Sequence, residues 1–354
     1  MPVLKVEEVR KKFPAPMSFK DMVLSPILGR KRRGFWAVDG VSFEIHKGEI
    51  MGLIGESGCG KTTLGRIILG LLPSIDGGGV FVKGLDKSVF EYSRQEMRQY
   101  RRRAQMIFQN PDVSLNPRMK IGDGIREALS IKGTLDRKES DALIAEYLKL
   151  VCLNKEDMEK YPDELSGGEK KRICIARALA VQPDIIIGDE PFTGLDISLR
   201  NQIIEVLLRE RQERNPSFLF ISHDISTIGY LTSKMAVMYL GKIVEISPSE
   251  KILSDGEARH PYTRGLLSAS RHLGSLAGEG EEQPLRYLSF GPGIWTAGPH
   301  PLNGQKGCVF RKRCYVYKDV LRRSEKERCD GEEPQLSEVE GDHKVACHFA
   351  LQVN

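Results

Sequence analysis

The stretch "GESGCGKT", residues 55 to 62, matches the phosphate-loop pattern of a glycine, four residues, a second glycine, a lysine and a threonine. It follows the apolar, strand-like run "IMGLI" and leads into the helical pattern "GKTTLGRIILGLL". In that setting the glycines let backbone N–H groups surround a phosphate at the positive end of a helix. The sequence therefore predicts an α/β nucleotide-binding domain built around this loop, rather than a chance glycine-rich turn.

The side chains of the loop suit a nucleoside triphosphate. We expect Lys61 to place a positive charge on the β- and γ-phosphates, and the Thr62 hydroxyl to bind Mg²⁺. Cys59 is expected to be a small filler that points away, because phosphoryl transfer to water needs no thiol. The loop residues predicted to bind nucleotide are Gly55, Glu56, Ser57, Gly58, Cys59, Gly60, Lys61, Thr62 and Thr63.

A second motif is the apolar run "DIIIGDE", which ends in Asp189 and Glu190. A carboxylate at the tip of a buried strand beside a phosphate loop is suited to bind magnesium, and its neighbour can orient and deprotonate the attacking water. We therefore predict that Asp189 is a magnesium ligand and Glu190 the general base. The alternative is an acidic pair that caps the next element.

Composition limits the function classes. The 354 residues are 40% hydrophobic and 29% charged, which is typical of a globular protein with one large and one smaller domain. No run approaches the roughly 18 apolar residues of a spanning helix, and the first residues, "MPVLKVEEVRKKF", lack a secretion-signal pattern. A cytosolic protein is expected. The net charge of +5 and the runs "RKRR" and "RRR" are not interleaved with aromatics, so a solvated face explains them better than nucleic-acid binding.

The order of patterns along the chain predicts the domain organisation. Strand-like runs occupy residues 4–9, 37–45 and 50–55, residues of about 90–180 are mainly helical, and strand-like runs return between 184 and 246. Such alternation indicates a mostly parallel sheet with a helical insert. After about residue 255 the chain becomes rich in glycine and proline and leads to a cysteine-bearing tail. We predict domains at 1–255 and 256–354.

The motif "LSGGEKKR", residues 165 to 172, indicates which family of phosphate-loop ATPases the chain resembles. Here the chain resembles the nucleotide-binding subunit of an ABC transporter, whose signature is LSGGQ, with Glu169 at the last position. The resemblance implies a mostly parallel core sheet, an antiparallel β subdomain and a helical insert. It also implies that four signature residues act on the nucleotide of a partner subunit: Ser166, Gly167, Gly168 and Glu169.

Other family motifs fall in order around the signature. Gln109 in "IFQNP" matches the Q-loop, which implies a contact to magnesium and the reacting phosphate. Asp196 in "TGLD" matches the D-loop, and His223 in "ISHD" the switch histidine, which implies a γ-phosphate contact. In the family an aromatic after the first strand stacks on adenine. Phe13 in "VRKKF" is the first candidate and Phe35 the second.

Further resemblance points to the oligopeptide and dipeptide importer branch. It rests on "MIFQNPDVSLNPRMKIGDGIREAL", "HPYTRGLLSA" and the cysteine tail. It implies an ATPase at the cytoplasmic face of the membrane that works with a second, related or identical, ATP-binding subunit, two membrane permeases and an extracytoplasmic binding protein. The cargo is not encoded here, so oligosaccharides and nickel chelates remain open beside peptides. A soluble ABC ATPase acting on nucleic acid or ribosomes is the alternative, but the chain has one nucleotide domain and a short insert.

Four of the seven cysteines stand in the tail: Cys308, Cys314, Cys329 and Cys347. Disulfides are not expected in a reducing compartment, and four thiolates suit either tetrahedral zinc or an iron–sulfur cluster. The spacing lacks the tight pairs of most zinc sites, so the residues alone leave zinc, a cluster and free thiols open. Similar tails of the form GC-x-F-x-x-RC hold a 4Fe-4S cluster in some relatives, and this resemblance favours the cluster. The gap between Cys314 and Cys329 is longer than in that pattern.

Overall fold

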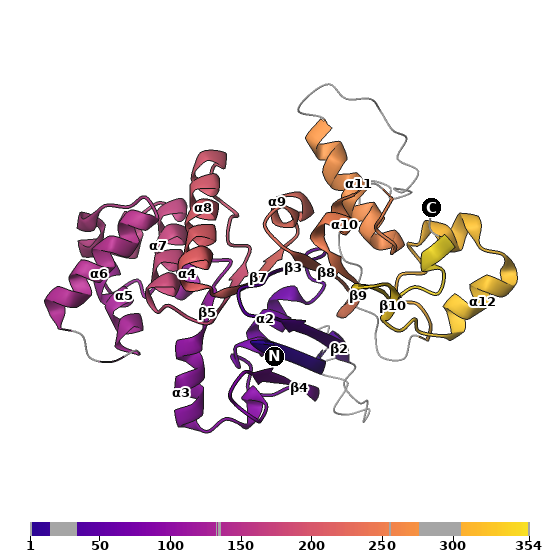
Figure 1. Ribbon diagram of the computed structural model, residues 1–354, viewed down its shortest axis with the longest axis horizontal. Helices are drawn as coiled ribbons and strands as arrows, with labels where there is room; N and C mark the ends of the chain where they lie inside the picture. The colour runs from indigo at the N-terminus through magenta and orange to yellow at the C-terminus, as the bar shows by residue number, and fades with distance from the viewer. Residues whose placement is uncertain are drawn as a thin grey trace, which may run out of the picture.

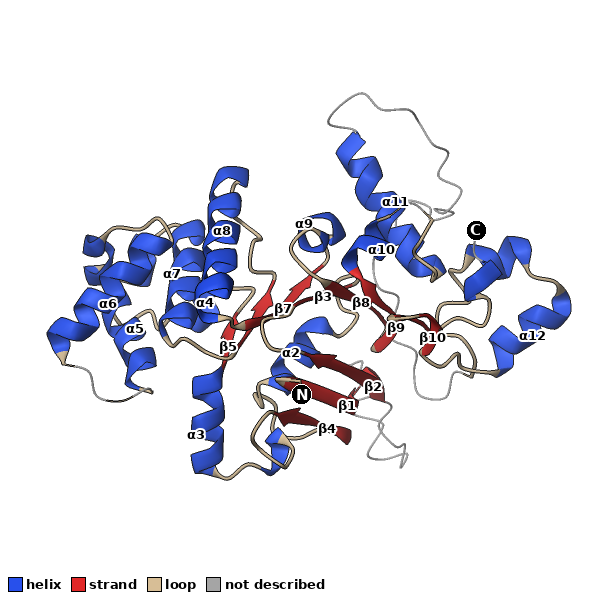
Figure 2. Cartoon of the chain, viewed as in Figure 1, coloured by secondary structure: helices blue, strands red, loops and turns tan. Residues whose placement is uncertain are grey.

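The computed structural model describes residues 2–14, 34–131, 133, 136–254, 256–275 and 306–352. Within these ranges the strands form one eight-stranded and one three-stranded sheet. Figure 1 shows the longer sheet running through the middle of the molecule, with a helical arm at one end and the C-terminal segment at the other. Figure 2 shows the smaller sheet below it, near the N-terminus.

The central strands of the large sheet are parallel. β3 pairs with β7 and β8, and β6 pairs with β5 and β7. β3, β6 and β7 are buried throughout, which explains why their sequences are continuous apolar runs without alternation. In sheet order, the strands are β10 (Ser337–Glu340), β11 (His343–Val345), β9 (Lys242–Pro248), β8 (Lys234–Tyr239), β3 (Ile50–Ile54), β7 (Ser217–Ser222), β6 (Ile185–Asp189) and β5 (Ala104–Ile107).

The small sheet is antiparallel and carries the aromatic residues of the site. Its order is β2 (Gly34–Ile45), β1 (Leu4–Pro14) and β4 (Gly77–Val82). β1 and β2 cover the predicted strands and extend beyond them. Their register places Phe13 opposite Phe35. β4 has the sequence "GGGVFV", and its three glycines hid it from pattern analysis.

Most helices lie where the sequence patterns place them. Their bounds are α2 (Lys61–Ile68), α3 (Arg94–Arg103), α4 (Pro111–Ser114), α5 (Ile121–Ser130), α6 (Arg137–Leu150), α7 (Gly167–Ala180), α8 (Ile197–Arg214), α9 (Ile225–Gly229), α10 (Ser249–Leu253), α11 (Pro261–Ser275) and α12 (Arg323–Gly331). Shorter turns are η1 (Val89–Glu91), η2 (Lys155–Glu159), η3 (Pro162–Glu164), η4 (Val316–Val320) and η5 (Ala350–Gln352). The helical segment 90–180 is interrupted by β5, which joins the large sheet.

The C-terminal segment continues the large sheet. β11 pairs with β9, and β10 with β11. His343 of β11 and Glu245 of β9 are almost fully buried, and His343 Nε2 lies 2.7 Å from Glu245 Oε1. Strands β10 and β11 therefore extend the large sheet beyond β9. Among the described residues, no helix has the length and apolarity required to cross a membrane.

Candidate functional site

The phosphate loop lies between β3 and α2, as predicted from its sequence. Glycine is required at two points because the loop passes close to other backbone. A Cβ on Gly60, which has φ +114°, would lie 2.1 Å from the Ala37 carbonyl oxygen, and one on Gly55 would lie 2.2 Å from that of Met238. The loop is therefore seated between the small sheet and the end of β8.

Lys61 closes the loop. Its Nζ donates to the carbonyl oxygens of Gly55 at 2.6 Å and Glu56 at 2.9 Å. Cys59 is buried under the loop, where burial raises the pKa of its thiol. The protonated thiol is neutral at neutral pH, which agrees with its expected role as a filler.

A cavity of about 350 Å³ opens beside the loop. Its volume is within the usual range of small-molecule sites. The predicted site residues that line it are Phe13, Phe35, Ser57, Gly58, Gly60, Lys61, Thr62, Thr63, Gln109, Asp189 and Glu190. Gly55, Glu56 and Cys59 are not among the residues that line it. The fold thus joins five distant segments in one cavity.

Phe13 and Phe35 both line the cavity, and their ring centroids lie 6.2 Å apart. The sequence offered the two rings as alternatives, since about twenty residues separate them in the chain. The structure brings them together because they face each other across the β1–β2 pair. A flat base can therefore approach an aromatic surface built from two rings.

Oxygen ligands suitable for magnesium lie at the carboxyl end of β6. The Thr62 hydroxyl donates to Asp189 Oδ1 at 3.1 Å. Asp189 is 2% exposed, and burial raises its pKa. Hydroxyl and carboxylate oxygens are hard donors of the kind that Mg²⁺ prefers, so these residues fit that ion. Gln109 lines the same cavity and can add an amide oxygen.

Glu190 is held by several donors at the end of β6. Its Oε1 accepts from the His223 backbone N–H at 3.0 Å and lies 2.6 Å from His223 Nδ1. Its Oε2 accepts from the hydroxyls of Thr193 at 3.1 Å and Ser222 at 3.2 Å. The backbone of Glu190 has φ +49°, a strained value for a residue with a side chain. A carboxylate fixed in this way is oriented toward the cavity before substrate arrives.

Pattern analysis missed the partners that orient these groups. Thr193 and Ser222 lie within the quoted motifs "TGLD" and "ISHD", but a short hydroxyl side chain gives no signal of its contact with Glu190. Lys171 is 2% exposed, and its Nζ donates to the carbonyl oxygens of Phe108 at 2.9 Å and Gln109 at 3.0 Å. Burial lowers the pKa of Lys171. It fixes the backbone of the segment around Gln109 from helix α7, and the run "EKKR" alone does not reveal this.

The predicted signature residues lie elsewhere. Ser166 caps α7: its hydroxyl oxygen accepts from the Glu169 N–H at 3.3 Å, and Glu169 Oε2 accepts from the Ser166 N–H at 2.8 Å. This capping box explains how a glutamate serves at this position. Asp196 caps α8 by accepting from Leu199 N–H at 2.9 Å. The described residues that line the cavity of this chain do not include Ser166, Gly167, Gly168, Glu169 or Asp196.

Comparisons with known proteins identify the family to which the chain belongs. A model of ABC transporters matches residues 38–193, and one of the oligopeptide/dipeptide transporter C-terminal region matches residues 244–320. The putative oligopeptide transport ATP-binding protein YkfD of Bacillus subtilis is 39% identical over 90% of this chain and 91% of its own length. The chain belongs to the oligopeptide/dipeptide family of ABC transporter ATP-binding subunits.

Other members support the same family. The oligopeptide transport ATP-binding protein AppF of B. subtilis is 37% identical over 98% of this chain and 97% of its own length. Among solved structures, the dimeric ATP-binding cassette MJ0796 bound to ADP and phosphate covers 70% of this chain and 98% of its own, with a TM-score of 0.60 and 24% identity. This structure shows that the fold is that of an ABC cassette.

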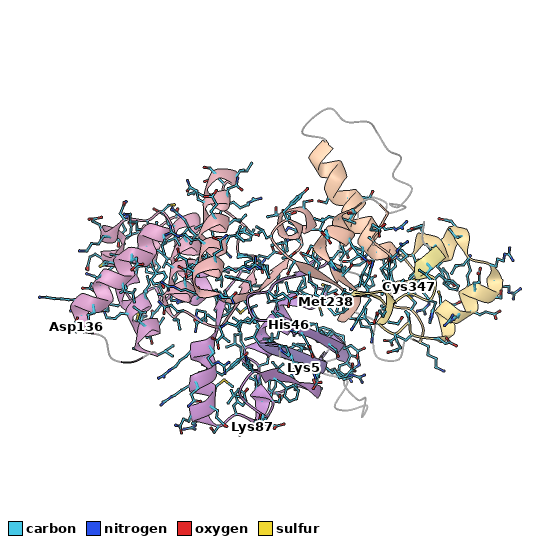
Figure 3. All side chains as sticks on the ribbon, in the orientation of Figure 1. Lys5, His46, Lys87, Asp136, Met238 and Cys347 are labelled. Atoms are coloured by element: carbon cyan, nitrogen blue, oxygen red, sulfur yellow. The ribbon has the colours of Figure 1, made fainter. Side chains whose placement is uncertain are left out.

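The segment after residue 305 contains the four cysteines, of which only Cys308 and Cys314 lie within the match to the family C-terminal region. Cys308, Cys314, Cys329 and Cys347 all line one apolar cavity of about 20 Å³. Figure 3 labels Cys347 in this segment, at the opposite side of the molecule from Asp136 of the helical arm. Burial is the main cause that raises the thiol pKa values, to about 11 for Cys314 and Cys329 and about 12 for Cys347.

The expected metal site at these cysteines has no direct support from side-chain arrangement. In the part of the chain that the structure describes, no group of three or more His, Cys, Asp or Glu side chains is arranged to hold a metal ion. The thiols share a cavity but do not converge as ligands of a single ion. The cavity has room for about one water molecule, so a larger group requires the thiols to move apart.

Proposed function

We propose that this chain is the ATP-hydrolysing subunit of an ABC importer that takes up dipeptides and oligopeptides. One observation carries the proposal: a single cavity joins the phosphate loop, the Thr62–Asp189 pair and the oriented Glu190. The peptide substrate is supported by relatives whose names specify oligopeptide transport and peptide import. The domain division at 1–255 and 256–354 belongs to the same proposal.

The residues in and around the cavity have separate roles in hydrolysis. Phe13 and Phe35 stack on adenine, and the loop N–H groups with Lys61 bind the phosphates. Thr62, Asp189 and Gln109 hold Mg²⁺, which when bound supplies positive charge to the terminal phosphates. Glu190 accepts a proton from the attacking water, and His223 orients Glu190 and contacts the γ-phosphate.

The signature residues are proposed to act in a second subunit. Ser166, Gly167, Gly168 and Glu169 form the exposed N-terminus of α7, whose positive dipole end suits a γ-phosphate. These residues are not among the described residues that line the cavity of their own chain, which supports action across a dimer, with Asp196 at the same interface. The second ATP-binding subunit is identical or related.

We expect the dimer to work at the cytoplasmic face of the membrane. Its partners are two transmembrane permeases and an extracytoplasmic binding protein. Closure of two subunits around ATP then drives the permeases between inward-facing and outward-facing states. Oligosaccharides and nickel chelates are alternative cargoes for the same machinery. No observation favours a soluble ATPase acting on nucleic acid or ribosomes.

Reconstitution tests this function. The chain is assembled in proteoliposomes with its permeases and second subunit, and ATP hydrolysis is measured with binding protein added alone, with a peptide mixture, with oligosaccharides or with nickel chelates. Stimulation by the peptide mixture supports the proposal. Stimulation only by another cargo overturns the peptide assignment, and stimulation by nucleic acid without permeases overturns the importer assignment.

The four cysteines are proposed to form one metal centre, a 4Fe-4S cluster in the first place and zinc as the alternative. Support comes from the shared cavity, which gathers residues from 308 to 347. The cluster comes first because the tail resembles the GC-x-F-x-x-RC tails that hold one, and binding it requires the thiols to move apart. Iron and zinc content of protein purified without oxygen tests this. About four irons per chain would support the cluster. One zinc per chain would show a zinc site instead, and no metal would show four free thiols.

A further inference from the structure

The second residue of the phosphate loop is bound by the C-terminal part of the chain. Glu56 accepts two hydrogen bonds from the Arg313 guanidinium, at 2.6 Å and 2.8 Å. The Glu56 backbone N–H donates to the Tyr262 hydroxyl at 2.9 Å. The Glu56 and Tyr262 side chains are buried, and the Arg313 side chain is 15% exposed. Residues more than 200 positions downstream in the sequence therefore fix both the side chain and the backbone of Glu56.

Arg313 is itself immobilised by aromatic rings. Its guanidinium carbon lies 5.6 Å from the ring centre of Tyr239 and 6.0 Å from that of Phe310. The rings of Tyr239, Tyr262 and Phe310 pack against one another with centroids 4.7 Å to 5.5 Å apart. A guanidinium held over aromatic faces loses little further entropy when it binds a carboxylate in two-pronged fashion.

The position of Glu56 is transmitted to Lys61. The Glu56 N–H is bound by Tyr262, and the Glu56 carbonyl oxygen accepts from Lys61 Nζ at 2.9 Å. Glu56 does not line the nucleotide cavity, whereas Lys61 does. A shift of Glu56 therefore reaches bound phosphate through the loop backbone and through Lys61, not by direct contact.

We infer that Arg313 and Tyr262 are positioning residues of the ATP site: by holding Glu56, they keep the phosphate loop in its nucleotide-binding shape. The inference rests on the proposed ATPase function and goes beyond it. The region after residue 255 then contributes to the shape of the nucleotide site and is not a separate domain without a role in ATP binding. Removing the guanidinium leaves the Glu56 carboxylate mostly buried without its charged partner, which favours another path of the loop.

The test measures the dissociation constant of ATP, with EDTA present, for the full-length chain. Arg313→Gln is compared with Lys312→Gln, which removes the same charge from an exposed neighbour. We expect Arg313→Gln to weaken ATP binding about tenfold, since hydrogen bonds to charged groups are involved, and Lys312→Gln to leave it unchanged. Tyr262→Phe, which removes only the hydroxyl, is expected to weaken it about threefold. Arg313→Lys restores part of the affinity.

A double-mutant cycle shows whether Arg313 acts through Glu56. If it does, Glu56→Gln and Arg313→Gln together weaken binding no more than the stronger single change. Arg313→Gln with a lowered melting temperature but wild-type ATP affinity overturns the inference, because the ion pair is then only structural. If Arg313→Gln fails to fold, wild-type affinity in both Tyr262→Phe and Arg313→Lys overturns it equally. Failure of the wild-type chain to bind ATP both with EDTA and with Mg²⁺ contradicts the proposed function instead.

Discussion

His223 Nδ1 lies 2.6 Å from Glu190 Oε1, and the His223 backbone N–H donates to the same oxygen at 3.0 Å. One residue thus holds the carboxylate from two directions. The Glu190 side chain is 10% exposed and the His223 side chain 59%. The imidazole therefore remains accessible while it holds the carboxylate, although His223 is not among the described residues that line the cavity.

Loss of this imidazole is expected to slow hydrolysis more than it weakens binding. His223→Ala should lower kcat about 100-fold, as loss of a positioned acid–base partner does, with little change in the ATP dissociation constant. Steady-state kinetics and equilibrium binding measure the two effects. His46→Ala, at an exposed histidine, is the control and should behave as wild type. Equal kcat values for His223→Ala and His46→Ala would show that His223 has no role in hydrolysis.

The two aromatic rings are expected to contribute to the binding of the adenine base and not to the binding of the phosphates. Phe13→Ala and Phe35→Ala should each weaken ATP binding about fivefold, because stacking of a base on an aromatic ring contributes about 1 kcal/mol. Inorganic tripolyphosphate has no base, so it should bind the wild-type protein and the two variants with equal affinity. Competition between tripolyphosphate and a fluorescent ATP analogue measures both. Equal loss for ATP and tripolyphosphate would indicate damage to the small sheet rather than lost stacking.

The cap of α7 predicts a pH-dependent effect at Glu169. The Ser166 hydroxyl lowers the pKa of the Glu169 carboxyl through a hydrogen bond. Because this pKa is depressed in the folded state, its stabilisation is present above the ordinary pKa of glutamate and is lost as pH falls through the folded value. Glu169→Gln should therefore be less stable than wild type at pH 7, and the difference should vanish in acid. Denaturant unfolding at both pH values measures this; a constant difference refutes it.

The buried contact between β9 and β11 predicts a stability effect. His343→Ala should lower the free energy of unfolding by about 2 kcal/mol, since it removes a hydrogen-bond partner from the buried Glu245 carboxylate. Lys344→Ala, at the exposed neighbour on the same strand, should change it little. Chemical denaturation compares them. If both variants unfold at the same denaturant concentration, the contact does not secure the C-terminal segment.

The sequence predicted the parts of the fold that local patterns specify. Buried parallel strands such as β6 and β7 are continuous apolar runs, so their positions could be read directly. β4 was missed because three of its six residues are glycine, and β5 because "AQMI" is too short to stand out within a helical segment. Strand β11 is three residues long and exists through its pairing with β9.

The motif residues of the site were predictable, but the residues that orient them were not. Arg313 and Glu56 are separated by 257 positions, and no local pattern connects an arginine of the cysteine-bearing tail to the phosphate loop. Lys171 was visible only as part of a charged run, although it is buried and fixes the Gln109 carbonyl. Such contacts depend on packing of distant elements, which periodicity does not report.

The most direct test of the central claim is peptide uptake by the reconstituted complex with Glu190→Gln in this chain. We expect this variant to bind ATP as tightly as wild type but to hydrolyse it at least about 100-fold more slowly, and uptake to stop with hydrolysis. Glu205→Gln, at an exposed position on α8, is the matched control and should support full uptake. Continued hydrolysis and uptake with Glu190→Gln would show that Glu190 is not the general base of this site.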